Sequence, residues 1–209
     1  MTEDQLEQDV VGQIPRLVVV GGPNGCGKTT FARYYARAEG LPYLGADDIA
    51  FEMAPADPAS VRVKAGREFS RRLSTALTVR DSLVIESTLA GASLARTVAS
   101  ARSDGYAVTI VLVFLDSPEL CLHRIEERVA QGGHDVPEED VRRRFRRVFP
   151  LFWHQYRPLA DRCLIVFNGG ESFLMVAEAE EDEWTIFDEQ LWMLFQSFLQ
   201  RDDDENTPA

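Results

Sequence analysis

The chain has 209 residues, of which 45% are hydrophobic and 27% charged, and its formal net charge is -12. This length and balance fit one folded domain, or one domain with a small appendage, and they exclude a wholly disordered chain. No apolar run approaches the roughly 20 residues that cross a bilayer. The acidic N-terminus does not resemble a secretory signal, and three widely spaced cysteines predict neither a disulfide framework nor a zinc site. We therefore expect a cytoplasmic protein with reduced thiols and no membrane association.

The negative charge is concentrated near the C-terminus. From Glu171 onward there are 12 acidic residues and one basic residue, Arg201, so that the first 170 residues are nearly neutral. Such an acidic segment keeps a protein solvated or offers a surface to a basic partner. Because nucleic-acid binding needs a basic surface, we expect no nucleic-acid partner.

Predicted strands and helices alternate along the chain. The β-branched run at residues 16–21 predicts a strand buried on both faces, and a glycine-rich turn leads from it into a helix over 28–38. Further strands are predicted over 42–45, 82–86, 106–115 and 163–167, with two short edge strands at 173–176 and 184–187. Further helices are predicted over 61–77, 94–102 and 191–199, and on either side of the glycines at 132 and 133. This alternation predicts an α/β fold of three layers with a mainly parallel central sheet of about five strands.

The strongest motif is Gly-Pro-Asn-Gly-Cys-Gly-Lys-Thr at residues 22–29. It has the G-x-x-x-x-G-K-[ST] spacing of a P-loop (Walker A), directly after a predicted strand and at the start of a predicted helix. Glycines let successive backbone N–H groups face one anion, and the helix N-terminus adds a partial positive charge. A turn that merely connects strand and helix is the alternative, but chance rarely produces this spacing in this context. The residues expected to hold ATP are Gly22, Pro23, Asn24, Gly25, Cys26, Gly27, Lys28, Thr29 and Thr30.

Two of these P-loop residues have a more specific expected role. Lys28 is expected to reach the β- and γ-phosphates and therefore to take part in catalysis. The hydroxyl of Thr29 is expected to be a ligand of Mg²⁺. The motif thus predicts both ATP and Mg²⁺ as cofactors.

Carboxylates follow the predicted second and third strands. Asp47, with Asp48 beside it, follows the second, and the third ends in Ile-Glu-Ser-Thr with Glu86 and Thr88. Ligands of open α/β sheets lie beyond the carboxyl ends of the strands, so these groups could accept a proton or orient an acceptor. The spacing leaves open that Asp47 only caps a helix and that Glu86 is an ordinary strand end. Asp116, after the fourth strand, is a rival metal-holding acid, although its Ser-Pro turn is typical of a helix start.

Arginines are dense between residues 124 and 147. Arg124 and Arg128 are four residues apart and are expected opposite an apolar helix face formed by positions 122, 125 and 129. In the following helix, Arg144 lies close to the apolar stripe, whereas Arg143 and Arg147 are expected to point into solvent. An inward-facing guanidinium on a mobile helical hairpin can neutralise charge on a γ-phosphate. Surface solubility and a salt-bridged helix pair are the alternatives. The Gly-Gly-His at 132–134 is predicted as the tip of this lid, with His134 as a bystander.

These motifs together resemble the zeta-toxin-like P-loop kinases of bacteria. The resemblance covers residues 16–177 and rests on the P-loop, the Ala-Asp-Asp, the Ile-Glu-Ser-Thr-Leu, and the Arg-Val-x-x-Gly-Gly-His-Asp-Val-Pro followed by Arg-Arg-Arg-Phe. It implies an ATP-dependent kinase with a helical lid, acting on a hydroxyl group of a small molecule. The best-known members of the family phosphorylate UDP-N-acetylglucosamine, and an antitoxin or another protein is an expected partner.

The resemblance also implies roles for individual residues. Asp47 matches the catalytic base, with Asp48 as the alternative, and Glu86 and Thr88 match substrate-binding positions. Arg128 and Arg144 match two arginines around the γ-phosphate, with Arg124 as a rival for the first of them or a substrate contact. We expect residues 1–177 to form the kinase domain, with the lid at 124–147, and residues 178–209 to form an acidic strand and helix extension. A kinase for another metabolite or antibiotic, a polynucleotide end kinase and an ATP-binding switch with little turnover are the alternative functions.

Overall fold

A computed structural model describes residues 14–91, 93–133, 135–170 and 172–200 of the protein. Within these residues a single sheet of seven strands has the order β2-β3-β1-β4-β5-β6-β7. The first five strands along the chain are β1 (Arg16–Gly21), β2 (Tyr43–Leu44), β3 (Leu83–Ser87), β4 (Ala107–Phe114) and β5 (Arg162–Phe167). They pair in parallel, as the sequence predicts.

Two antiparallel strands extend the same sheet beyond β5. These are β6 (Leu174–Glu180) and β7 (Glu183–Ile186), and β6 pairs with β5. The sheet therefore has seven strands, because the two predicted edge strands extend the parallel sheet of about five strands that the sequence predicts. β6 runs across residue 177, where the sequence suggests the end of the kinase domain.

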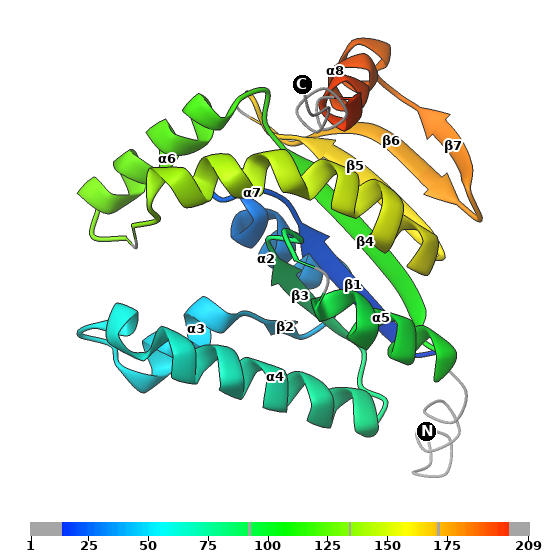
Figure 1. The fold of residues 1–209 in the computed structure, drawn as a ribbon. Helices are drawn as coiled ribbons and strands as arrows, with labels where there is room; N and C mark the ends of the chain where they lie inside the picture. The colour runs from blue at the N-terminus through cyan, green and yellow to red at the C-terminus, as the bar shows by residue number, and fades with distance from the viewer. Residues whose placement is uncertain (1–13, 92, 134, 171, 201–209) are drawn as a thin grey trace, which may run out of the picture.

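Helices cover both faces of the sheet (Figure 1). The described helices are α2 (Lys28–Ala38), α3 (Ala46–Met53), α4 (Arg62–Thr78), α5 (Ser93–Ser103), α6 (Pro118–Ala130), α7 (Glu138–Leu151) and α8 (Glu189–Gln200). Because parallel crossovers are right-handed, α2, which connects β1 to β2, covers one face, and α5 and α7, on connections that run the other way along the sheet, cover the opposite face. None of the helices among these residues is long and apolar enough to cross a membrane.

The core lies along β1 and β4. Leu17, Val18, Val19 and Val20 of β1 have no exposed surface, and most of β4 is equally buried. These strands are covered on both sides, which explains their continuous apolar sequence. The rigid centre of the sheet therefore ends at the loop that follows β1.

The C-terminal elements contribute an aromatic layer to this core. Phe195 and Phe198 of α8 lie against Phe114 of β4 and Phe149 of α7, with ring centroids 4.5–6.4 Å apart. All three tryptophans of the chain also meet here, at centroid distances of 5.1–6.1 Å: Trp153, just beyond α7, Trp184 of β7 and Trp192 of α8.

Two local predictions differ from the structure. The short helix α3 directly follows the predicted second strand, where the sequence leaves a helix open only as an alternative. On α6 the buried residues are Cys121 and Ile125, whereas Val129, expected in the apolar face, is 38% exposed. The prediction for Val129 is wrong because α6 projects past the sheet, so that its last turn has little to pack against (Figure 1).

Candidate active site

The P-loop between β1 and α2 is held in place by close backbone contacts. Gly25 and Gly27 adopt φ angles of 80° and 92°, in the left-handed region that favours glycine. A Cβ on Gly25 would lie 2.4 Å from the carbonyl oxygen of Cys121 on α6. Asn168, which follows β5, donates a hydrogen bond of 2.9 Å from Nδ2 to the carbonyl oxygen of Cys26. The loop is therefore fixed between α6 and the end of β5.

The functional side chains of the loop have local partners. Lys28 donates a 2.7 Å hydrogen bond from Nζ to the carbonyl oxygen of Pro23, across the loop. Thr29 donates a 2.8 Å hydrogen bond from Oγ1 to Oε2 of Glu86 at the end of β3. The P-loop hydroxyl and the β3 carboxylate, which the sequence predicts separately, thus lie in direct contact.

A cavity of about 360 Å³ opens beside the P-loop. It lies at the carboxyl ends of β1 and β3, and α3, α4, α6 and α7 also contribute to its walls. Its lining residues are Asn24, Gly25, Gly27, Lys28, Thr29, Thr30, Ala46, Asp47, Arg62, Glu86, Ser87, Thr88, Arg124, Arg128, Val136 and Arg144. Five of these residues are cationic and two are carboxylates, a balance that favours an anionic ligand.

Most of the predicted site residues meet in this cavity. The exceptions are Gly22, Pro23 and Cys26, which belong to the loop but do not line the cavity. Cys26 is fully buried beneath the loop. Burial raises the pKa of the Cys26 thiol, and the nearby Lys28 opposes this only in part, so that Cys26 is a packing residue.

The two adjacent aspartates lie in different surroundings. Asp47 lines the cavity, whereas Asp48 forms an ion pair with Arg33 of α2. Gly45 is the N-cap residue of α3, so Asp47 does not cap that helix. The arrangement leaves the carboxylate of Asp47 available to a ligand.

Tyr43 lies beneath this part of the site. The guanidinium of Arg33 lies over its ring in a cation–π contact, 5.5 Å from the ring centroid. Burial, followed by the nearby carboxylate of Glu86, raises the pKa of Tyr43, so its hydroxyl stays protonated near neutral pH.

The hairpin of α6 and α7 supplies three arginines to the cavity. Arg144 donates a 3.1 Å hydrogen bond from Nη1 to Oδ1 of Asn24 in the P-loop, and it forms a 3.3 Å ion pair with Asp140. Its inward orientation is as predicted, since Val141, Phe145 and Val148 form the buried face of α7. Arg124 and Arg128 approach the cavity from α6. His134, between the two helices, lies outside the described residues.

Four further lining residues have no role predicted from the sequence: Ala46, Ser87 and Val136, which belong to the quoted motifs, and Arg62, which belongs to none. Arg62 reaches it from the start of α4, and Val136 from the segment before α7. No local motif marks Arg62, because only the packing of α4 beside α3 brings it to the P-loop. Asp116, the rival metal-holding acid, accepts a 3.1 Å hydrogen bond from Ser117 in the turn before α6 and does not line the cavity.

The sheet order and the P-loop define an α/β protein of the P-loop kinase-like class. Residues 17–151 match the AAA_33 family, described as an AAA domain, and the chain belongs to this family. An uncharacterized protein of Haemophilus influenzae is 30% identical over 124 residues, which are 59% of this chain and 88% of that protein.

Solved structures support the same fold. A chain of the AvrRxo1-ORF1:-ORF2 complex, which has also been solved with ATP, matches with a TM-score of 0.67 and 16% identity over 94% of this chain, which spans 66% of that one. A structure of the PezAT toxin-antitoxin system of Streptococcus pneumoniae matches with a TM-score of 0.59 and 14% identity, covering 95% of this chain and 93% of that one. A putative kinase from Chloroflexus aurantiacus has a TM-score of 0.57 and 22% identity, with 75% and 90% covered.

Proposed function

We propose that this protein is an ATP-dependent phosphotransferase that moves the γ-phosphoryl group of ATP to a hydroxyl group of a small molecule. The observation that carries the proposal is the single cavity that gathers the P-loop, a carboxylate and a set of arginines. The P-loop amides and Lys28 would hold the β- and γ-phosphates, with Lys28 exchanging the carbonyl of Pro23 for a phosphate oxygen.

The residues around Thr29 fit Mg²⁺. Thr29 Oγ1 and Glu86 Oε2 lie 2.8 Å apart at the edge of the cavity and are oxygen ligands of the kind this hard cation prefers. The described residues contain no cluster of three or more metal-binding side chains, which suits an ion that keeps phosphate oxygens and waters as its other ligands. When bound, Mg²⁺ would supply positive charge to the β- and γ-phosphate oxygens.

The positions of the other cavity residues support a role for each in the transfer step. The acceptor oxygen attacks the γ-phosphorus, the bond to the β–γ bridging oxygen breaks, and the acceptor's proton passes to the carboxylate of Asp47. Arg128 and Arg144 would neutralise the charge that spreads over the transferring group. Thr88 and Arg124 line the same cavity and would position the acceptor.

The resemblance supports the choice of acceptor, and the resemblance and the comparisons support a protein partner. A nucleotide sugar such as UDP-N-acetylglucosamine is one candidate acceptor, beside other metabolites and antibiotics. AvrRxo1-ORF1:-ORF2 is a complex and PezAT is a toxin-antitoxin system, and we include a protein partner, such as an antitoxin, in the proposal.

The matched pair Asp47→Asn and Asp48→Asn tests the assignment of the base. Asp47→Asn should lower phosphoryl transfer about 10²–10⁴-fold, the usual contribution of a general base, and leave ATP affinity nearly unchanged. Asp48→Asn removes an ion pair at the protein surface, which contributes about 0–1 kcal/mol to stability, and should keep near-normal transfer. The readout is the mass gain of one phosphoryl group over a panel of nucleotide sugars, nucleosides and metabolites, beside ATP binding measured by titration.

Lys28→Ala provides the contrast in the same assays, because it should weaken both ATP binding and transfer, whereas Asp47→Asn should weaken transfer alone. Near-normal turnover in Asp47→Asn would refute the base assignment, and unchanged ATP affinity in Lys28→Ala would refute the P-loop assignment. Tight ATP binding without any phosphorylated product would favour the ATP-binding switch instead.

A further inference from the structure

A second cavity, of about 330 Å³, lies between α7 and the segment that leads from β3 into α5. It shares Ser87, Thr88 and Arg144 with the nucleotide cavity, so the two are contiguous. Arg143 and Arg147 of α7 also line it, and none of its described lining residues is acidic. Both arginines are exposed to solvent, as the sequence predicts, and they also border this cavity because the segment after β3 lies opposite α7.

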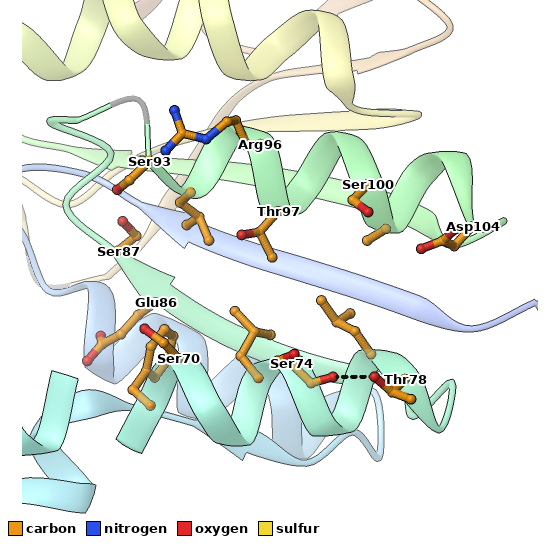
Figure 2. A pocket seen from close by; sticks show the side chains of 15 residues that line it. Ser70, Ser74, Thr78, Glu86, Ser87, Ser93, Arg96, Thr97, Ser100 and Asp104 are labelled. Carbon is orange, nitrogen blue, oxygen red and sulfur yellow. Dashed lines mark hydrogen bonds between the residues drawn. The ribbon is translucent and has the colours of Figure 1, made fainter. Parts of the chain in front are cut away.

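The groove between α4 and α5 continues from this second cavity. It has a volume of about 650 Å³ and shares Ser87 and Ser93 with the arginine-lined cavity. Figure 2 shows hydroxyl side chains on both of its walls, among them Ser74 on α4 and Thr97 on α5. Apolar side chains of both helices lie between them. A groove with hydroxyls over an apolar surface suits a polyhydroxylated body such as a sugar.

The arginines at the junction outnumber the acidic side chains that pair with them, because Arg143 and Arg144 share Asp140. Arg143 forms a 2.7 Å ion pair with Asp140. In the described part of the chain no acidic side chain pairs with Arg147 or with Arg96. In Figure 2 the side chain of Arg96 extends from α5 back toward Ser93, the end of the groove that adjoins the arginine-lined cavity.

We propose that the acceptor carries an acidic group, a phosphate or a carboxylate, which Arg143 and Arg147 bind, and that its hydroxylated body extends along the groove between α4 and α5. The inference rests on the proposed function, because the arginine-lined cavity reaches the transfer site through Ser87 and Thr88. Guanidinium groups match the planar or branched oxygens of carboxylate and phosphate by paired hydrogen bonds. Glu86 and Ser87 line both the groove and the nucleotide cavity, so the end of the acceptor that reaches them would present its hydroxyl at the transfer site.

Inorganic phosphate is the first probe, titrated calorimetrically into protein saturated with Mg²⁺ and the non-hydrolysable ATP analogue AMP-PNP, so that the P-loop is occupied. Saturable binding is expected, and its affinity should fall at least tenfold in the double variant Arg143→Ala/Arg147→Ala. Arg146→Ala is the matched control, since Arg146 lies on the same helix but lines none of the three cavities. It should change the affinity less than twofold. Absence of saturable binding, or an equal loss in the control, would overturn the inference.

The binding affinities of glucose, glucose 6-phosphate and gluconate are then measured under the same conditions. They compare a neutral sugar with its phosphate and carboxylate forms. At least one acidic form should bind at least tenfold more tightly than glucose, and the double variant should abolish that preference. The form that gains most identifies phosphate or carboxylate as the acidic group. Equal binding of all three compounds, or no binding of any, would count against the inference.

The kinase assay separates this inference from the proposed function. In the double variant the KM for an acidic acceptor should rise at least tenfold. Transfer to neutral acceptors with unchanged KM in the double variant would overturn the acidic-acceptor inference and leave the kinase standing. Phosphate binding without a phosphorylated product from any acceptor would overturn the proposed function, and with it the acceptor role of this anion site.

Discussion

Gly25 is a position where one added methyl group would reach the backbone of another element. An alanine Cβ there would lie 2.4 Å from the carbonyl oxygen of Cys121, and the φ of 80° disfavours any side chain. Gly25→Ala must therefore displace the P-loop or α6, and we expect ATP affinity to fall at least tenfold. ATP titration and urea unfolding measure the two effects of the variant, on binding and on stability.

Gly40→Ala provides the control for backbone strain. Gly40 has a similar φ of 64°, but nothing lies within 4 Å of its would-be Cβ. The variant should lose about 1–2 kcal/mol of stability from the left-handed conformation alone and should keep its ATP affinity. Equal ATP affinity in the two variants would contradict the close-contact explanation.

The sequence predicts those site residues whose roles are encoded locally. Lys28 and Thr29 follow from the spacing of the P-loop between a strand and a helix, which is a local pattern. Asp47 and Asp48 are neighbours in sequence, and only the folded structure distinguishes them: Asp47 lines the cavity, whereas Asp48 forms an ion pair with Arg33. Arg62 could not be predicted, because tertiary packing alone brings it to the cavity.

Among the elements, α8 tests how far the C-terminal part supports the kinase fold. Phe195 is fully buried and lies against Phe114 of β4 and Phe149 of α7. Phe195→Ala should lower the free energy of unfolding by about 3–5 kcal/mol, the usual result of truncating a buried aromatic side chain. Met193, on the same helix, is 60% exposed, and Met193→Ala should change it by no more than about 0.5 kcal/mol. Urea unfolding measures both, and a small effect of Phe195→Ala would mean that α8 packs loosely.

The predicted elements are most accurate where burial is continuous. β1 and β4 are recognised from their β-branched runs, because both of their faces are covered. The short helix α3 has only eight residues and shows no long apolar period, so its pattern could not be separated from a strand end. β6 continues past the predicted end at residue 176, and Glu178 in this added part forms an ion pair with Arg162 of β5.

At the scale of the whole molecule, the three cysteines predict how stability depends on alkaline pH. All three thiols are buried, and burial raises the pKa of each, that of Cys163 to about 12. In the unfolded chain a thiol loses its proton near pH 8.5. Between about pH 8.5 and 12 the folded state therefore holds more protons at Cys163 than the unfolded state, and the free energy of unfolding should fall as pH rises.

The expected slope is at most about 1.4 kcal/mol per pH unit for each thiol. Urea unfolding between pH 7 and 10 measures it, and Cys163→Ala should reduce the slope by the share of one thiol. An unchanged slope in that variant would show that other groups dominate the alkaline loss of stability.

The gathering of every tryptophan at one end of α7 has a consequence for optical measurements. None of the three lines the nucleotide cavity, but Trp153 lies two residues beyond the helix that carries Arg144. Emission from the indole rings therefore cannot report direct contact with a bound nucleotide. A shift in that emission when ATP is added would instead record a displacement of α7, which connects Arg144 at the phosphates with the tryptophans near the edge strand β7.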